Sequence, residues 1–156
     1  MSRLDTTAEP ICVLLVDDDP DCRELVADAA QQGHLDNEVV AVVDARDALA
    51  FLDRRPPYAG APRPGLIYLD LEMPGMHGQE LLRRIKRRPD LCDIPVVILS
   101  SLDDDDQRAE AAAAGAAAYV VKPIDPDKLR DTVLAAANYR LTILAAGRSH
   151  AEALQP

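Results

Sequence analysis

The sequence predicts an α/β fold in which a doubly wound, five-stranded parallel sheet carries helices on both faces. Five short apolar runs, each bounded by polar or turn residues, alternate along the chain with segments of helical pattern. Strands that alternate with helices in this way form parallel βαβ units. The chain has 156 residues, 48% of them hydrophobic, which is enough for one domain with a full core.

The five apolar runs are the expected strands, since each has the length and the boundaries typical of a buried strand. They cover residues 11–16, 38–43, 66–69, 94–99 and 118–121. The third run leads directly into Asp70 and a Pro-Gly turn, so we expect it to be the central strand. A proline-rich loop at residues 55–65 precedes it.

Helix start signals follow the strands. The Asp-Pro pairs at residues 19–20 and 125–126 each place an N-cap residue before a proline at the first helical position, and Asp44 is a third N-cap. Gly115 is placed to end a helix. The expected helices cover residues 20 to about 32, 45 to about 54, 78–88 and 103–114, and a last helix starts at residue 126.

The composition excludes several classes of function. A net charge of −10 argues against nucleic acid as the main partner, because binding a phosphate backbone requires a basic face. The N-terminus has no apolar signal region, and no run of about 18 apolar residues suggests a membrane span, so we expect a cytoplasmic protein. Cys12, Cys22 and Cys92 lack metal-type spacing and are expected to be free thiols.

Polar side chains follow four of the expected strands. Asp17 and Asp18 follow the first strand and Asp70 the third, whereas Ser100 follows the fourth and Lys122 the fifth. In an open parallel sheet, ligands bind in the crevice outside the carboxyl ends of the strands. Any one of these residues alone could be a turn, cap or solvated residue, but the order and spacing of all five indicate one polar site.

The charges of this expected site require a positive partner. Two carboxylates about 5 Å apart repel by roughly 3 kcal/mol at an effective dielectric constant near 20. Lys122 supplies one positive charge, and Mg²⁺ held by Asp17 and Asp18 would supply two more. Asp70, alone at its strand end, is then a candidate nucleophile toward phosphorus. Lys122 and Ser100 could bind the phosphoryl oxygens.

With these residues in this order, the sequence resembles the receiver domain of two-component response regulators over residues 11–137. The resemblance implies a flavodoxin-like sheet of order 2-1-3-4-5. By position, Asp70 matches the phosphoacceptor, and Asp17 and Asp18 match the acidic pair that binds Mg²⁺. Glu72 lies where the family supplies a backbone carbonyl to the metal, with its side chain where receivers tune dephosphorylation.

The resemblance further implies a single-domain response regulator that is not an enzyme: it accepts a phosphoryl group from a histidine kinase and switches conformation. Lys122 and Ser100 match the residues that bind the phosphoryl group, and Tyr119 matches the aromatic residue that swings inward when the hydroxyl moves. Ser100 stands where threonine is commoner, which keeps the hydrogen bond but loosens the rotamer preference. The loop at 55–65 and the segments 90–95 and 139–145 are similar to regulators paired with phytochrome-type histidine kinases.

The tail suggests how the chain associates. We expect a flexible N-terminus over residues 1–10, the receiver domain over 11–138 and a C-terminal extension over 139–156, too short for a DNA-binding or catalytic output domain. An apolar helical stripe continues past the usual end of the last helix, at Leu129, Val133, Ala137, Leu141 and Leu144. We therefore expect a homodimer through the last helix and the extension. The alternative is a tail that folds back on its own domain.

Two other functions stay open at this point. A receiver-like fold that no longer takes phosphate would act as a protein-binding module, although the complete set of acids, hydroxyl and lysine argues against it. A metal-dependent phosphatase with an aspartyl nucleophile usually needs a general-acid Asp two residues further on, and Glu72 occupies that position instead.

Overall fold

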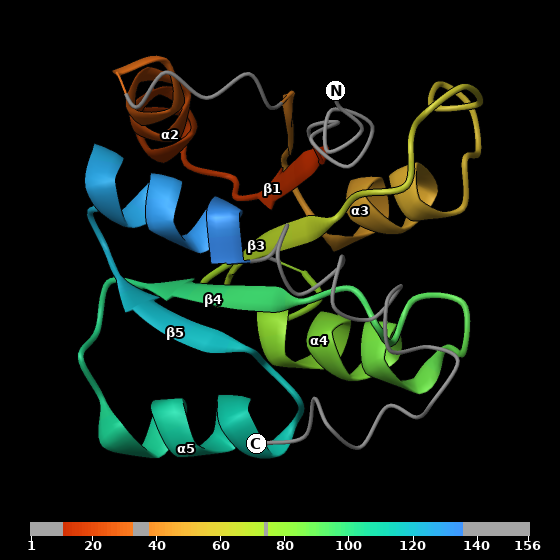
Figure 1. Ribbon diagram of the computed structural model, residues 1–156. Helices are drawn as coiled ribbons and strands as arrows, with labels where there is room; N and C mark the ends of the chain where they lie inside the picture. The colour runs from red at the N-terminus through yellow and green to blue at the C-terminus, as the bar shows by residue number, and fades with distance from the viewer. Residues whose placement is uncertain (1–10, 33–37, 74, 136–156) are drawn as a thin grey trace, which may run out of the picture.

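Five parallel strands form the sheet in the computed structural model, in the order β2-β1-β3-β4-β5 (Figure 1). The strands are β1 (Val13–Val16), β2 (Val39–Val42), β3 (Leu66–Asp70), β4 (Val96–Ser100) and β5 (Ala118–Val121). The structure describes residues 11–32, 38–73 and 75–135. The predicted α/β fold and the strand order implied by the receiver resemblance are both confirmed.

The register brings the carboxyl ends of neighbouring strands side by side. The last residue pair between β1 and β3 immediately precedes Asp17 and Asp70, so these two residues are neighbours across the strands. Further along the sheet, the Ser100 carbonyl accepts a hydrogen bond of 2.8 Å from the backbone N–H of Lys122. Backbone pairing alone therefore gathers most of the predicted site at one edge of the sheet.

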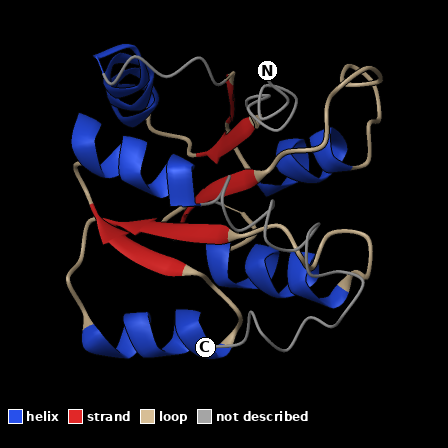
Figure 2. Cartoon of the chain, in the orientation of Figure 1, coloured by secondary structure: helices blue, strands red, loops and turns tan. Residues whose placement is uncertain are grey.

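Helices cover both faces of the sheet (Figure 2). They are α2 (Pro20–Gln32), α3 (Ala45–Leu52), α4 (Gly78–Arg87), α5 (Asp105–Ala113) and a last helix whose described part covers residues 126–135. Strand side chains alternate between the faces: Ile67 and Ile98 pack with α3, α4 and α5, and Tyr68 and Leu99 pack with α2 and the last helix. The three central strands, β1, β3 and β4, are buried on both faces, which explains why they read as continuous apolar runs.

The predicted N-caps are present. The Asp44 carboxylate accepts a hydrogen bond of 2.8 Å from the backbone N–H of Asp47, and Asp125 accepts one of 2.7 Å from Lys128. Asp19 acts in the same way at the start of α2. Each carboxylate satisfies a backbone N–H that has no partner inside its helix.

Three elements, β1, β4 and α5, begin two residues later than predicted. The carbonyl of Ile94 accepts a hydrogen bond of 2.8 Å from the Lys86 ammonium, and Pro95 has no N–H to donate to the sheet, so β4 begins after them. In the acidic run before α5, Asp104 is the residue whose side chain accepts from two backbone N–H groups of the first turn. The other boundaries differ from prediction by two residues or fewer.

Several predictions concern residues that the structure does not describe. The flexible N-terminus at 1–10, the C-terminal extension and its part in a homodimer all lie outside the described residues, apart from the first turns of the last helix. Within those turns, Leu129 and Val133 of the predicted apolar stripe are buried and Leu134 is exposed. Among the described helices, none has both the length and the apolar character needed to cross a membrane. The three cysteines are free, as predicted.

Candidate functional site

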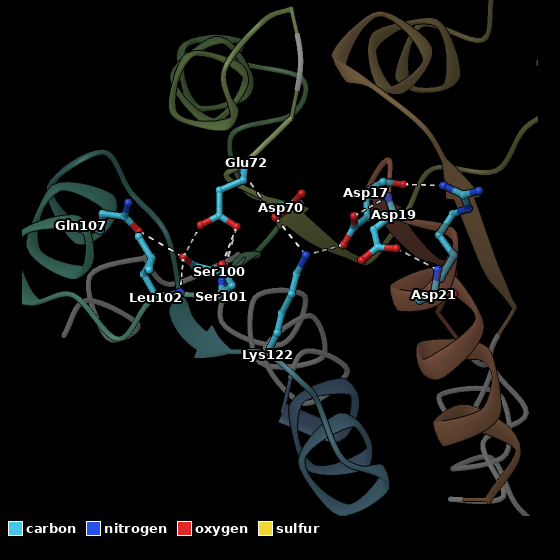
Figure 3. A network of polar contacts seen from close by, with 11 residues as sticks. Asp17, Asp19, Asp21, Asp70, Glu72, Ser100, Ser101, Leu102, Gln107 and Lys122 are labelled. Carbon is cyan, nitrogen blue, oxygen red and sulfur yellow. Dashed lines mark hydrogen bonds and ion pairs between the residues drawn. The ribbon is translucent and has the colours of Figure 1, made fainter.

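The Lys122 ammonium lies between two buried carboxylates at the carboxyl edge of the sheet (Figure 3). Its Nζ is 3.0 Å from Asp17 Oδ2 and 3.1 Å from Asp70 Oδ1. Both acids are almost fully inaccessible to solvent, at 0% and 1% exposure. Three residues more than fifty positions apart in sequence thus meet in one pocket, as their places at strand ends predicted.

Local hydrogen bonds fix the backbone on the β1 side of the pocket. The second carboxylate oxygen of Asp17 accepts a hydrogen bond of 2.9 Å from the backbone N–H of Asp19. The guanidinium of Arg23, one turn into α2, donates to the Asp17 carbonyl at 2.9 Å. These contacts tie the start of α2 to the end of β1, so the acidic side chains keep their direction.

The α4 side of the pocket depends on a close approach of backbone to backbone. A Cβ added at Gly78 would lie 2.5 Å from the carbonyl oxygen of Asp70 and 2.8 Å from the Cα of Leu71. Gly78 is the first residue of α4, and His77 caps this helix by accepting from the N–H of Gln79. The absence of a side chain at position 78 therefore lets α4 start directly against the strand end that carries Asp70.

Burial and charge perturb the ionisable groups of the pocket. Burial, helped by the negative charge of Asp17, raises the pKa of Asp70 to about 6 against the opposing effect of Lys122. Burial lowers the pKa of Lys122, but its hydrogen bond to Asp17 and the charges of both acids outweigh this and leave that pKa raised. Burial and a hydrogen bond to Asp17 raise the pKa of the Cys22 thiol to about 12. The pocket carries more negative charge than one ammonium balances.

Three carboxylates at this edge are close enough to hold a cation together. One oxygen atom from each of Asp17, Asp18 and Asp70 lies within 4.8 Å of the others. Asp18 is exposed, whereas the other two are buried, so the group opens toward solvent. Mg²⁺ prefers oxygen ligands and usually keeps several waters. An all-carboxylate set with a solvent-facing side fits the predicted Mg²⁺.

Ser100 lies beside this pocket and contacts side chains rather than the Asp70 carboxylate (Figure 3). Its Oγ is 3.1 Å from Glu72 Oε2 and 3.1 Å from Gln107 Oε1, and it accepts a hydrogen bond of 3.1 Å from the N–H of Leu102. The other oxygen of Glu72 accepts from the Ser101 hydroxyl at 3.0 Å. The Glu72 carboxylate therefore engages both serines that follow the apolar part of β4.

Tyr119 and Ser100 share no hydrogen bond in the described part of the chain, but both hydroxyls lie next to Gln107. Tyr119 Oη is 2.8 Å from Gln107 Oε1 and donates to the carbonyl of Leu102 at 2.7 Å. The guanidinium carbon of Arg108 lies 4.6 Å from the centre of the tyrosine ring, which is a cation–π distance. Gln107 and Ser101 were not among the predicted site residues, because nothing in their local sequence marks them.

Comparison with known proteins gives the class of this chain. Residues 13–134 match the family described as the response regulator receiver domain. Because this match covers most of the sequence, and the sheet and the acid–lysine pocket agree with it, the chain belongs to the receiver family.

Two curated relatives are response regulators of Synechocystis sp. Rcp1 is 39% identical over 97 residues, which are 62% of this chain and 66% of Rcp1. Rre1 is 32% identical over 126 residues, which are 81% of this chain and 51% of Rre1. The match thus spans less than two thirds of the length of either relative.

Solved structures with the same fold include regulators named for phytochromes. The bacteriophytochrome response regulator AtBRR has a TM-score of 0.73 at 31% identity, covering 84% of this chain and 94% of that one. The phosphorylated cyanobacterial phytochrome response regulator RcpA has a TM-score of 0.71 at 32% identity, covering 85% and 94%. The Mn²⁺-bound form of Rcp1 has a TM-score of 0.69 at 33% identity, covering 81% and 91%.

Proposed function

We propose that this protein is a response regulator whose Asp70 accepts a phosphoryl group from a histidine kinase. The observation that carries the proposal is the Lys122 ammonium held 3.0 Å from Asp17 and 3.1 Å from Asp70. In the transfer, an Asp70 oxygen attacks the phosphorus of a phosphohistidine. The P–N bond breaks, the imidazole leaves with the electron pair and takes up a proton, and an aspartyl phosphate forms.

Mg²⁺ supplies positive charge to the transferred group when it is bound. Asp17, Asp18 and Asp70 would hold it with carboxylate oxygens and Glu72 with its backbone carbonyl. Lys122 binds a phosphoryl oxygen, because its ammonium already contacts the carboxylate that is modified. The phosphoryl group adds a charge of about −1.5 to −2 near pH 7, and this charge attracts Lys122 and the Ser100 hydroxyl.

The phosphorylated pocket then signals through Ser100 and Tyr119. Movement of the Ser100 hydroxyl toward the phosphoryl group changes the position of the Tyr119 ring on β5. Because Tyr119 packs against α5, the face formed by α5, β5 and the last helix changes shape. A face that changes with phosphorylation is a suitable contact for a downstream partner.

The proposal extends to the partners of this chain. Regulators named for phytochromes are among the similar structures, which supports a phytochrome-type histidine kinase as the phosphoryl donor. We further propose a homodimer through the last helix and the C-terminal extension, for which the exposed Leu134 offers apolar surface. The net charge of −10 opposes nucleic acid as a partner, and we propose that the protein works in the cytoplasm.

Radiolabel transfer tests the proposal. A histidine kinase labelled on its phosphohistidine is mixed with the full chain and Mg²⁺, and label on the regulator is followed with time. We expect rapid transfer to the wild-type chain and none to Asp70→Asn. Asp131→Asn, which changes an exposed aspartate on the last helix, is the matched control and keeps transfer.

Beryllofluoride with Mg²⁺, a mimic of the phosphoryl group, separates the proposal from the protein-binding module that takes no phosphate. We expect the mimic to change the spectrum of the wild-type chain and to leave Asp70→Asn unaffected. A chain that neither takes label from the kinase nor responds to the mimic is the protein-binding module. Turnover of a generic phosphate ester would instead indicate a phosphatase.

A further inference from the structure

A continuous series of polar contacts lies beside the acid–lysine pocket and runs through Glu72, Ser100, Gln107 and Tyr119. Figure 3 shows its first three members. The Ser100 hydroxyl lies 3.1 Å from the Glu72 carboxylate and 3.1 Å from the Gln107 amide. The same amide atom lies 2.8 Å from the Tyr119 hydroxyl. The series joins the loop after β3 to β4, α5 and β5.

Counting protons fixes how the Gln107 amide is oriented. Each hydroxyl carries one proton. The Ser100 hydroxyl donates its proton to the Glu72 carboxylate, and the Tyr119 hydroxyl donates its proton to the Leu102 carbonyl. An amide oxygen facing both hydroxyls would therefore receive no proton from either. The two ends of an amide have nearly the same shape. With the NH₂ end facing the hydroxyls, its two protons serve both oxygens, and every contact is a hydrogen bond.

We infer that Gln107 is the positioning residue that couples Ser100 to Tyr119, and that Glu72 holds Ser100 in the resting arrangement. This inference rests on the proposed phosphorylation of Asp70 and names the side chains that connect it to β5. With the NH₂ end of Gln107 facing the hydroxyls, the Ser100 oxygen donates once, to Glu72, and accepts twice, from Gln107 and the Leu102 N–H. Its hydrogen-bonding capacity is full, so it reaches a phosphoryl oxygen only by releasing Glu72.

Burial makes this release consequential for Tyr119. Ser100 is 0% exposed, so water does not readily replace the contacts that it gives up. When the hydroxyl turns toward Asp70, the Gln107 amide loses its acceptor on Ser100 and is free to move. The Tyr119 hydroxyl then loses the fixed donor that it has in the resting state, while Arg108 keeps the ring attached to α5.

The coupling is testable in the resting protein, without phosphate or metal. The full chain is labelled with fluorotyrosine, and the Tyr119 resonance in the ¹⁹F spectrum is assigned by its loss in Tyr119→Phe. Ser100→Ala removes the neighbouring oxygen, and we expect it to shift the Tyr119 resonance. In a Gln107→Met background, which keeps the length of the side chain but not the amide, Ser100→Ala should leave that resonance in place.

Controls keep this test decisive. Gln31→Met makes the same change at an exposed position of α2 and should not alter the effect of Ser100→Ala. If Gln107→Met does not fold, Gln107→Ala replaces it, because alanine is already the commonest residue of the second half of α5. Equal shifts with and without the Gln107 amide would overturn the coupling, as would no shift in the wild-type background.

A titration with beryllofluoride and Mg²⁺ tests the role of Glu72. Glu72→Gln keeps the backbone carbonyl and the size of the side chain but removes the charged acceptor of Ser100. We expect about fivefold tighter binding of the mimic, the effect of one weakened hydrogen bond in the resting state. Unchanged or weaker binding would refute the holding role. A wild-type chain that does not bind the mimic refutes the proposed function, whereas the ¹⁹F experiment still decides the coupling.

Discussion

Removing the charge of Asp70 should stabilise the fold. The pKa of this buried carboxyl is raised from 3.8 to about 6, which means that the folded state disfavours its charged form. Each pKa unit corresponds to about 1.4 kcal/mol, so the charge costs roughly 3 kcal/mol at pH 7.5. Asp70→Asn keeps the shape of the side chain and removes its charge. For a domain of this size we expect a melting temperature higher by about 6–12 °C.

The pH dependence identifies the cause of this gain. Below about pH 3, Asp70 is mostly protonated in both the folded and the unfolded chain, and the wild type bears almost no penalty. Between about pH 4 and 6 the unfolded chain loses this proton before the folded chain does, so the stability of the wild type falls as the pH rises. The advantage of Asp70→Asn should therefore be small at pH 4, grow through this interval and level off above about pH 6.

Urea unfolding at several pH values in buffer with EDTA measures the effect, because bound Mg²⁺ would itself stabilise the wild type. Asp131→Asn, an exposed aspartate on the last helix, is the control and should change the free energy of unfolding by less than about 0.5 kcal/mol. The reasoning is wrong if Asp70→Asn is no more stable than the wild type at pH 7.5, or if its advantage is the same at pH 4.

Three further substitutions test other parts of the structure. Lys122→Met leaves two buried carboxylates without their ammonium, so we expect the free energy of unfolding to fall by about 3–5 kcal/mol in metal-free buffer. Mg²⁺ should partly restore it, and unchanged stability would contradict this. Gly78→Ala places a Cβ 2.5 Å from the carbonyl of Asp70 and should lower the melting temperature, whereas Gly60→Ala, with nothing within 4 Å, should not. Asp104→Ala removes the α5 cap and should cost about 1 kcal/mol in urea unfolding, and equal losses for Asp104→Ser would argue against capping.

Most of the fold could be predicted because local and global signals agree. Strands buried on both faces give continuous apolar runs, and the helices begin at acidic caps such as Asp44 and Asp125. The weaker predictions fall where several residues compete for one role. In the run of four aspartates around the start of α5, the sequence does not distinguish which of them caps the helix, and the structure selects Asp104.

The residues of the site also divide into those that the sequence predicts and those that it does not. Asp17, Asp70 and Lys122 could be predicted because backbone register alone brings strand ends together. Gln107 could not, because its role depends on a side chain that reaches two hydroxyls from different strands, in a helix whose pattern is otherwise that of an alanine-rich surface. The contacts of Glu72 with Ser100 are of the same kind, since residue spacing carries no information on where a long side chain points.

The energetics of the pocket bear on why these residues are present at all. A buried ion pair is weak evidence for stability, because the cost of removing two charges from water can exceed their attraction. Here the cost is larger than for a simple ion pair, because a single ammonium, that of Lys122, faces the two carboxylates of Asp17 and Asp70. The pKa of Asp70 remains raised despite this ammonium. A core built for stability alone would place an apolar or neutral residue at position 70. A group held in an unfavourable charge state beside a cation-sized set of oxygens indicates binding chemistry, and the stability gained by Asp70→Asn measures what that chemistry costs the fold.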